Sequence, residues 1–216
     1  MKTKLLQTVL FICLLYPSLS SAQFFEAGVG GGFNTHNVVT DVHVIGNRGG
    51  LSAAANAGII IFPTYTVGLM YMQNKWGYTT YHGNVDLATP ARNYSVYLTK
   101  HFKLPNYTYH SWHSDLSIRV YAGLTYVNKG SMIIDQINYY YHNNFVGNGR
   151  NIGMQLEYSH PIYKMLNIFG NIGIGGAFME GVQKYWFYSY NGKLVEKKYR
   201  YNIMYYTSEI GIGLKI

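Results

Sequence analysis

Eight stretches of the chain place apolar residues at every second position, with polar or small residues between them. Between Leu116 and Tyr126, for example, apolar residues occupy the even positions, whereas Ser117, Arg119 and Thr125 lie at odd positions. Because successive side chains of a strand point to opposite faces, each stretch predicts a strand with one apolar face. The predicted strands cover residues 24–33, 51–62, 65–73, 92–102, 116–126, 152–159, 166–178 and 206–216.

The connections between the predicted strands alternate between long and short. Long connections cover residues 34–50, 74–91, 128–149 and 180–201, whereas 63–64 and 160–165 are tight turns and 105–114 is intermediate. Strands of about nine to twelve residues match the length that a tilted strand needs to cross a membrane. Short turns on one side and long loops on the other are typical of bacterial outer-membrane barrels. The pattern predicts an all-β fold, an eight-stranded antiparallel transmembrane up-and-down β-barrel, with its termini in the periplasm and its long loops extracellular.

A soluble β-sandwich or lipocalin-like barrel is the main structural alternative, because it uses the same alternation with the apolar residues inside. The face opposite the apolar one argues against it. In three predicted strands that face is rich in glycine, which makes a poor solvent-facing surface but fits a narrow lumen. These glycines are Gly28, Gly30, Gly32, Gly173, Gly175, Gly211 and Gly213.

Residues 1–22 have the pattern of a secretory signal peptide. A basic start is followed by an apolar run that is too short to span a bilayer, and Ser20-Ser21-Ala22 provides a small-residue cleavage site. Cys13, the only cysteine, lies in this segment, so the mature chain is expected to have no disulfide. Residues 23–216 are expected to form one domain, a β-barrel in the outer membrane of a Gram-negative bacterium.

The composition agrees with a strand-rich membrane protein. The chain has 23 tyrosines and 24 glycines, while only 12% of its residues are charged. Tyrosine suits strands and membrane interfaces, and glycine suits tight interiors. Removal of Lys2 and Lys4 with the signal peptide lowers the formal net charge from +8 to +6. Nucleic acid is a poor partner for this charge, because a secreted barrel leaves the compartment that holds nucleic acid.

Charged residues in the polar phase of the strands are expected to point into the lumen. These residues are Glu26, Arg119, Glu157, Glu209 and Lys215. An eight-stranded barrel is only wide enough to be filled by its own side chains, and buried charges there must pair. We therefore expect a filled lumen with an ion-pair network, in which Arg119 bridges Glu157 and either Glu26 or Glu209. A catalytic or proton-conducting role for the same residues is the less favoured interpretation, because such networks ordinarily fill a small lumen.

The last long connection predicts a ribbon that extends beyond the membrane. Asn191-Gly192 lies between two β-rich arms and signals a two-residue hairpin turn. The arms are rich in aromatic and basic residues, which form a girdle at lipid headgroups or bind a partner protein, anionic lipid or polysaccharide. The candidate binding residues are Lys184, Tyr185, Trp186, Tyr188, Tyr190, Lys193, Lys197, Lys198 and Arg200.

The sequence contains no recognisable catalytic or metal-binding motif. None of the eight histidines belongs to a His-Glu-x-x-His or cysteine-containing ligand set, so no metal and no cofactor is expected. His110, Ser111, His113 and Asp115 lie together, but contiguous residues in a turn seldom form a catalytic triad. We expect a protein that is not an enzyme.

The strand pattern, the loop asymmetry and the terminal strand Ile210–Ile216 resemble those of small eight-stranded outer-membrane barrels. The similar families are the OmpA membrane domain, OmpX-like and OmpW-like proteins and the outer-membrane β-barrel proteins of Bacteroidota. Such proteins usually end on an aromatic residue, from which Ile216 departs. The resemblance implies a structural or accessory role, with outer-membrane lipid, lipopolysaccharide and other outer-membrane proteins as partners.

Two alternatives follow from the same resemblance. Some barrels of this size acylate or deacylate lipid A, and others are narrow channels. The deacylases resemble one another in a His-x-Ser element, and no histidine of this chain has serine two positions on. That absence lowers the enzyme alternative without removing it.

Overall fold

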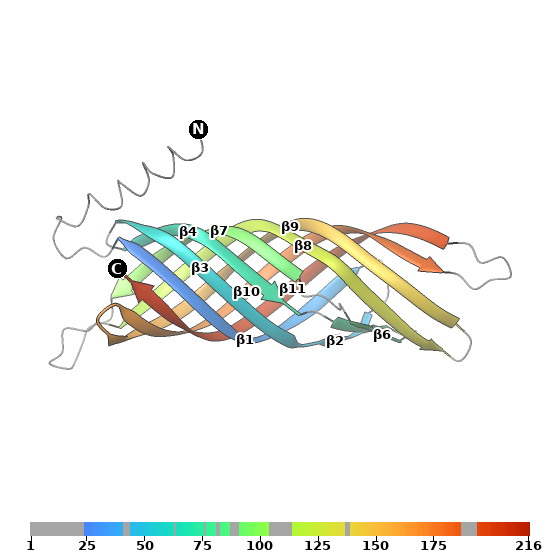
Figure 1. Cartoon of the computed structure of the whole chain (residues 1–216), viewed down its shortest axis with the longest axis horizontal. Helices are drawn as coiled ribbons and strands as arrows, with labels where there is room; N and C mark the ends of the chain where they lie inside the picture. Colours follow the sequence, from blue (N-terminus) through green and yellow to red (C-terminus); the bar gives the residue numbers. More distant parts are fainter. Residues whose placement is uncertain are drawn as a thin grey trace, which may run out of the picture.

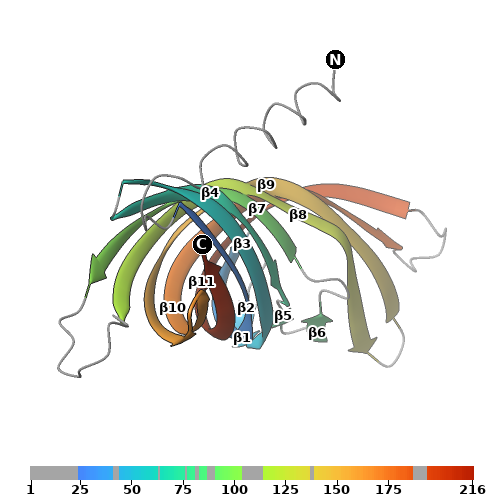
Figure 2. The same cartoon turned by 60° about the vertical axis from the view of Figure 1, so that its left-hand side comes forward.

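The computed structural model describes residues 24–40, 44–62, 64–75, 77–80, 83–86, 91–103, 114–136, 139–186 and 194–216. Within these residues, eight antiparallel strands close into a barrel (Figure 1). In order around the barrel they are β1 (Phe25–Thr40), β3 (Gly50–Phe62), β4 (Tyr65–Asn74), β7 (Ala91–Lys103), β8 (Asp115–Gln136), β9 (Tyr139–Tyr163), β10 (Leu166–Trp186) and β11 (Leu194–Lys215). The predicted all-β fold, an eight-stranded antiparallel barrel, is confirmed. The rotated view in Figure 2 shows the strong tilt of its strands.

Three short strands extend the sheet at one end of the barrel. They are β2 (Val44–Arg48), β5 (Gly77–Thr80) and β6 (Gly83–Asp86). β2 pairs with β5, β5 with β6, and β6 with the last part of β8. Figure 1 shows this end opposite the C-terminus. We call it the hairpin end, and we call the other end, where Phe24 and Ile216 lie, the terminal end.

The two ends of the described chain close the barrel. The Phe24 amide donates to the Ile216 carbonyl at 2.6 Å, and the Ile216 amide donates to the Phe25 carbonyl at 2.8 Å. From there the β1–β11 ladder continues without interruption to the pair Thr40 and Tyr201. The segment predicted to be the closing strand therefore closes the barrel, and the ladder leaves no open edge in this part of the sheet.

Large apolar side chains cover the outside of the barrel. Val29 is 62% exposed, Leu69 68% and Ile210 69%. Exposing so many large apolar residues to water is unfavourable, because each of them loses about 1.5–3 kcal/mol that burial would provide. We call these outward-facing residues the apolar belt; it also includes Val96, Leu98, Ile118, Val120, Leu124, Ile152, Leu156, Ile172 and Ile212.

The lumen is filled by aromatic rings that lie on glycines of other strands. A methyl group on Gly68 would lie 2.6 Å from Cζ of Tyr97, and one on Gly175 would lie 2.5 Å from Cζ of Tyr205. Side chains larger than hydrogen at these glycines would occupy the space of the rings. The predicted use of glycine in a narrow lumen is therefore confirmed. Several of these glycines accommodate a particular ring, whereas Gly32 and Gly173 lie against other atoms of the neighbouring strands.

Phe169 on β10 was not among the residues expected in the lumen, yet it is buried there with 7% of its surface exposed. It lies in the same phase as Asn167 and Asn171, which also point inward. Its ring fills the space left by glycines of β1 and β11. These glycines are Gly28, Gly30, Gly211 and Gly213.

The strands of the barrel continue far beyond the apolar belt at the hairpin end. We predicted a loop at residues 128–149, but β8 and β9 form a paired ladder that ends only at Gln136 and Tyr139. A register shift between Val127 and Gly130 marks the point where this ladder leaves the belt. Alternation vanished from the sequence there because neither face of a strand beyond the membrane needs to be apolar.

The sequence also predicted a signal peptide and no transmembrane helix. Residues 1–22, the expected signal peptide, lie outside the described residues. No helix among the described residues is long and apolar enough to cross a membrane.

The packing of rings on glycines predicts a clear difference between two glycines of β10. We expect Gly175→Ala to destabilise the barrel by about 2 kcal/mol, because the added methyl group overlaps the Tyr205 ring. Gly170→Ala is the matched control, since its methyl group would lie 3.9 Å from the nearest atom. Urea unfolding of the detergent-refolded variants measures both changes. Equal stability of the two variants would show that the rings do not depend on these glycines.

Candidate functional site

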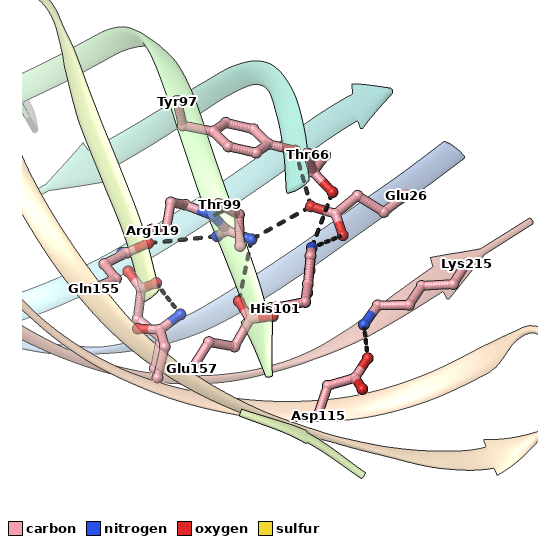
Figure 3. Close-up of polar contacts among 12 residues, drawn as sticks. Glu26, Thr66, Tyr97, Thr99, His101, Asp115, Arg119, Gln155, Glu157 and Lys215 are labelled. Carbon is pink, nitrogen blue, oxygen red and sulfur yellow. Dashed lines mark hydrogen bonds and ion pairs between the residues drawn. The ribbon is translucent and has the colours of Figure 1, made fainter. Parts of the chain in front are cut away.

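Arg119 on β8 is the centre of a buried polar network in the terminal half of the lumen (Figure 3). Its guanidinium lies 3.2 Å from Oε2 of Glu157 and 3.9 Å from Oε1 of Glu26. It also donates to Thr99 Oγ1 at 3.2 Å and to Gln155 Oε1 at 3.4 Å. The strand register explains this arrangement, because Thr99 and Gln155 are the cross-strand neighbours of Arg119 on β7 and β9.

Glu26 joins this network to β4 and β7. Its Oε2 lies 3.4 Å from Nε2 of His101, which is also 2.9 Å from the Thr66 hydroxyl. The Tyr97 hydroxyl donates to Oε1 of Glu26 at 3.3 Å, and the Arg119 guanidinium lies 4.7 Å from the centre of the Tyr97 ring. These side chains belong to β1, β4, β7 and β8, and Figure 3 shows them pointing towards one another. Such connected partners hold buried charges in one geometry.

Lys215 does not lie in the Arg119 cluster itself. Its ammonium group lies 2.6 Å from Oδ2 of Asp115, a residue that our sequence interpretation placed in a turn (Figure 3). Asp115 is the first residue of β8, and Lys215 is the last residue of β11. The pair therefore links two strands at the terminal end of the lumen.

Glu209 is a buried carboxylate without a basic partner at ion-pair distance among the described residues. It is 2% exposed, and its Oε2 accepts one hydrogen bond from Asn171 Nδ2 at 3.2 Å. No lysine, arginine or histidine of the described chain lies within 4.0 Å of this carboxylate. Of the two carboxylates proposed as the second partner of Arg119, the structure places Glu26, and not Glu209, at ion-pair distance.

The pocket beside the network is small. A cavity of about 20 Å³ lies beside Glu26, Arg119 and Glu157, and it is also lined by Phe169 and Lys215. This volume is sufficient for about one water molecule. Among the described residues no group of three or more His, Cys, Asp or Glu side chains is placed to hold a metal ion. The arrangement is suited to holding charges in a fixed geometry.

The structure describes the predicted binding ribbon in part. Lys184, Tyr185 and Trp186 belong to the end of β10, and Lys197, Lys198 and Arg200 belong to β11. The two strands pair as far as Trp186 and Leu194, so the ribbon extends beyond the apolar belt. Tyr188, Tyr190, Lys193 and the predicted Asn191-Gly192 turn lie outside the described residues. Arg200 is exposed and lies 3.4 Å from Glu180 of the paired strand.

Several residues of the lumen were missed by the sequence interpretation. They are Thr66, Tyr97, His101, Asp115 and Phe169. Each lies in the inward phase of its strand, so the period of two that identified Arg119 also marked their positions. Thr66, Tyr97, His101 and Phe169 were missed because we searched the inward face for charges and glycines. Asp115 was missed because we placed it in a turn and not at the start of a strand.

The structure describes only part of the segment that contains His110, Ser111, His113 and Asp115. His110, Ser111 and His113 lie outside the described residues, but Ser114 Oγ lies 2.8 Å from Nδ1 of His160 at the terminal end. The Tyr158 hydroxyl donates to the same Ser114 oxygen at 3.1 Å. The 2.8 Å between Ser114 Oγ and His160 Nδ1 is a distance that suits a nucleophile and its base. No carboxylate of the described residues lies within 4.0 Å of His160 to orient the ring.

The fold resembles that of known outer-membrane proteins. No family model and no curated protein sequence matches the chain. The crystal structure of a major outer membrane protein from Thermus thermophilus matches with a TM-score of 0.51 and 12% identity, covering 91% of this chain and 100% of that one. The crystal structure of Neisserial surface protein A matches with a TM-score of 0.50 and 12% identity, covering 89% and 97%. The chain therefore has the fold of small outer-membrane β-barrels, without a preference among the families named above.

The network predicts opposite effects for two buried glutamates. Glu157→Gln is expected to lower the free energy of unfolding by about 3 kcal/mol, because it removes the carboxylate nearest to Arg119. Glu209→Gln is expected to retain or raise it, because it removes an unpaired buried charge and keeps an oxygen that accepts from Asn171. Urea unfolding of both variants in the same detergent tests this contrast. A stable Glu157→Gln beside an unstable Glu209→Gln would contradict our account of the network.

Proposed function

We propose that this protein is a non-enzymatic outer-membrane barrel that carries a binding sheet beyond the membrane. In this proposal the protein is a structural or accessory subunit whose hairpin end is extracellular and whose termini are periplasmic, in a Gram-negative bacterium. The observation that carries the proposal is the extension of β8, β9, β10 and β11 beyond the apolar belt, above a lumen filled by side chains.

The apolar belt supports the membrane location. Its residues are exposed at the surface while the ionic side chains of Glu26, Arg119, Glu157 and Glu209 are buried, which is the reverse of a soluble protein. Aromatic side chains lie at both margins of the belt, which also supports the membrane location. Lys100 lies 4.0 Å from the centre of the Tyr65 ring at the terminal end, and Tyr94 contacts Tyr126 towards the hairpin end. Amphipathic rings are typical of the two membrane interfaces.

The filled lumen argues against the channel alternative. The rings of Tyr97, Tyr121 and Tyr205 and the Arg119 network occupy the lumen between the two ends. The Tyr121 and Tyr205 hydroxyls lie 3.1 Å apart, so they join side chains of β8 and β11 across the lumen. A continuous aqueous path would require these groups to separate.

The extended sheet supports a binding role. The β9–β10 ladder continues to the pair Asn144 and Lys184, and the β10–β11 ladder continues to Trp186 and Leu194. This segment is basic and aromatic in sequence, which suits other outer-membrane proteins or the phosphates of lipid and lipopolysaccharide as partners. Paired strands hold such residues in fixed positions, which lowers the entropic cost of binding.

The enzyme alternative has one observation in its favour, the hydrogen bond between Ser114 and His160. An acyl-transfer or deacylation reaction would use Ser114 as the nucleophile and His160 as the base. The alternative predicts release of labelled fatty acid from lipid A that is lost in Ser114→Ala. We expect no such turnover, since the pair has no described carboxylate partner and lies at the terminal end.

Reconstitution in planar bilayers tests the closed lumen. We expect the wild-type protein to show no steady ion conductance, because the lumen has room for about one water molecule beside Arg119. Arg119→Ala opens space within the network and is expected to produce small conductance events. Arg150→Ala is the control, because Arg150 is exposed outside the barrel. Steady conductance of the wild type would favour the channel alternative.

Shortening the extended sheet tests the binding role. A variant in which a two-residue turn replaces residues 182–198 would join β10 and β11 at the pair Gly181 and Tyr199. We expect it to fold and insert, because the barrel below that pair is unchanged, but to lose the proteins that crosslink to the wild type in native membranes. If the shortened variant crosslinked to the same proteins as the wild type, the proposed binding role of this sheet would be contradicted.

A further inference from the structure

On β7 and β9 the outer face of the barrel changes abruptly from apolar to basic at the margin of the belt towards the hairpin end. Arg92 on β7 and Arg150 on β9 are both exposed and point outward. The next outward residues towards the terminal end are Tyr94, 49% exposed, and Ile152, 57% exposed. The two arginines therefore occupy the first outward positions beyond the apolar surface on their strands.

The register places the two arginines around a tyrosine. β8 lies between β7 and β9, with Arg92 paired to Tyr126 and Arg150 paired to Leu124. Neighbouring strands lie about 4.8 Å apart and residues two apart on a strand about 7 Å apart, so the Cα atoms of Arg92 and Arg150 are about 12 Å apart. The Tyr126 side chain, 38% exposed, lies between them on the same outer face.

Neither arginine has a counter-ion in the described part of the chain. No described carboxylate lies within 4.0 Å of Arg92 or Arg150. Arg200, which lies on the same outer face of β11, is different because it pairs with Glu180 at 3.4 Å. A guanidinium at the edge of a hydrocarbon layer requires an anion or water to be stable, and its planar fork matches phosphate oxygens.

Aromatic rings form a continuous surface beside the two arginines. Tyr71 and Tyr94 have ring centres 5.1 Å apart, and Tyr94 and Tyr126 have ring centres 5.9 Å apart. The three tyrosines lie on β4, β7 and β8, on the outward face. Their rings provide an apolar surface beside the cations, as a lipid with a sugar or glycerol backbone between its phosphates and its acyl chains would require.

We propose that Arg92 and Arg150, with Tyr126 between them, form a site on the outer surface of the barrel for the phosphates of lipid A. This inference rests on the proposed function, because it requires the hairpin end to lie in the outer leaflet. Two outward arginines whose Cα atoms lie about 12 Å apart can each reach a separate phosphate, which suits a lipid whose headgroup carries two phosphates better than one with a single phosphate. The site fixes a lipid against the barrel next to the extended sheet.

The experiment uses the full mature chain in phosphatidylcholine nanodiscs that contain lipid A, with native mass spectrometry to count the retained lipid. We expect Arg92→Gln combined with Arg150→Gln to weaken lipid A retention at least tenfold. The matched control is Lys100→Gln combined with Lys164→Gln, which removes two positive charges at the terminal end. The control is expected to retain lipid A as the wild type does.

A comparison on the wild-type protein alone provides a second test that needs no variant. We expect lipid A to be retained, and dephosphorylated lipid A and phosphatidylglycerol to be lost at equal concentration. Equal retention of phosphatidylglycerol would show general attraction of anionic lipid, and equal loss in the control variant would show the same; either result overturns the site. Failure of the wild type to insert into nanodiscs would contradict the proposed function, whereas insertion without a phosphate preference would overturn the lipid A site alone.

Discussion

The limited width of an eight-stranded barrel is the constraint on which the rest of the structure depends. The lumen admits the side chains of eight strands and little else, so a large ring on one strand requires a glycine on another. Tyr97 lies on Gly58 and Gly68, and Phe169 lies on glycines of β1 and β11. The glycines of the lumen and the buried rings of Tyr97, Tyr121, Tyr205 and Phe169 therefore depend on one another. Together they produce a solid lumen, which places the surfaces available for binding on the outside of the barrel.

The same constraint explains why the charges can be buried. Arg119 reaches Glu157 and Glu26 because the short distance across the lumen brings strands far apart in sequence within reach of one side chain. The charged cluster lies in the terminal half, whereas neutral groups fill the half towards the hairpins. There Ser95 donates to Asn151 at 2.7 Å, and Asn151 donates to Thr125 at 3.2 Å. Buried ion pairs contribute little net stability, but they fix one arrangement of the strands around them.

The sequence predicted those features that repeat every two residues. It identified the closing strand and the inward face of Glu26, Arg119 and Glu157, because one lipid-facing side forces a strict alternation. It did not identify the partner of Lys215, since Asp115 lies 100 positions away and only closure of the barrel brings the two together. It also missed the length of β8 and β9, because strands surrounded by water on both faces carry no alternation. The predicted ribbon was visible only through its turn residues and its composition.

The sharp change on the outer face has a mechanical consequence for the extended sheet. On β7 and β9 the outward residue changes from Tyr94 and Ile152 to arginine within a single step of two residues. A displacement of the barrel by one such step, about 7 Å along a strand, would bring arginines into hydrocarbon or apolar residues into water. The cost of moving an arginine into hydrocarbon rises with depth to about 2–4 kcal/mol at the membrane centre, so these residues favour one vertical position of the barrel. Because β8, β9, β10 and β11 are continuous through this margin, the height at which their ends stand above the membrane is defined by the same residues.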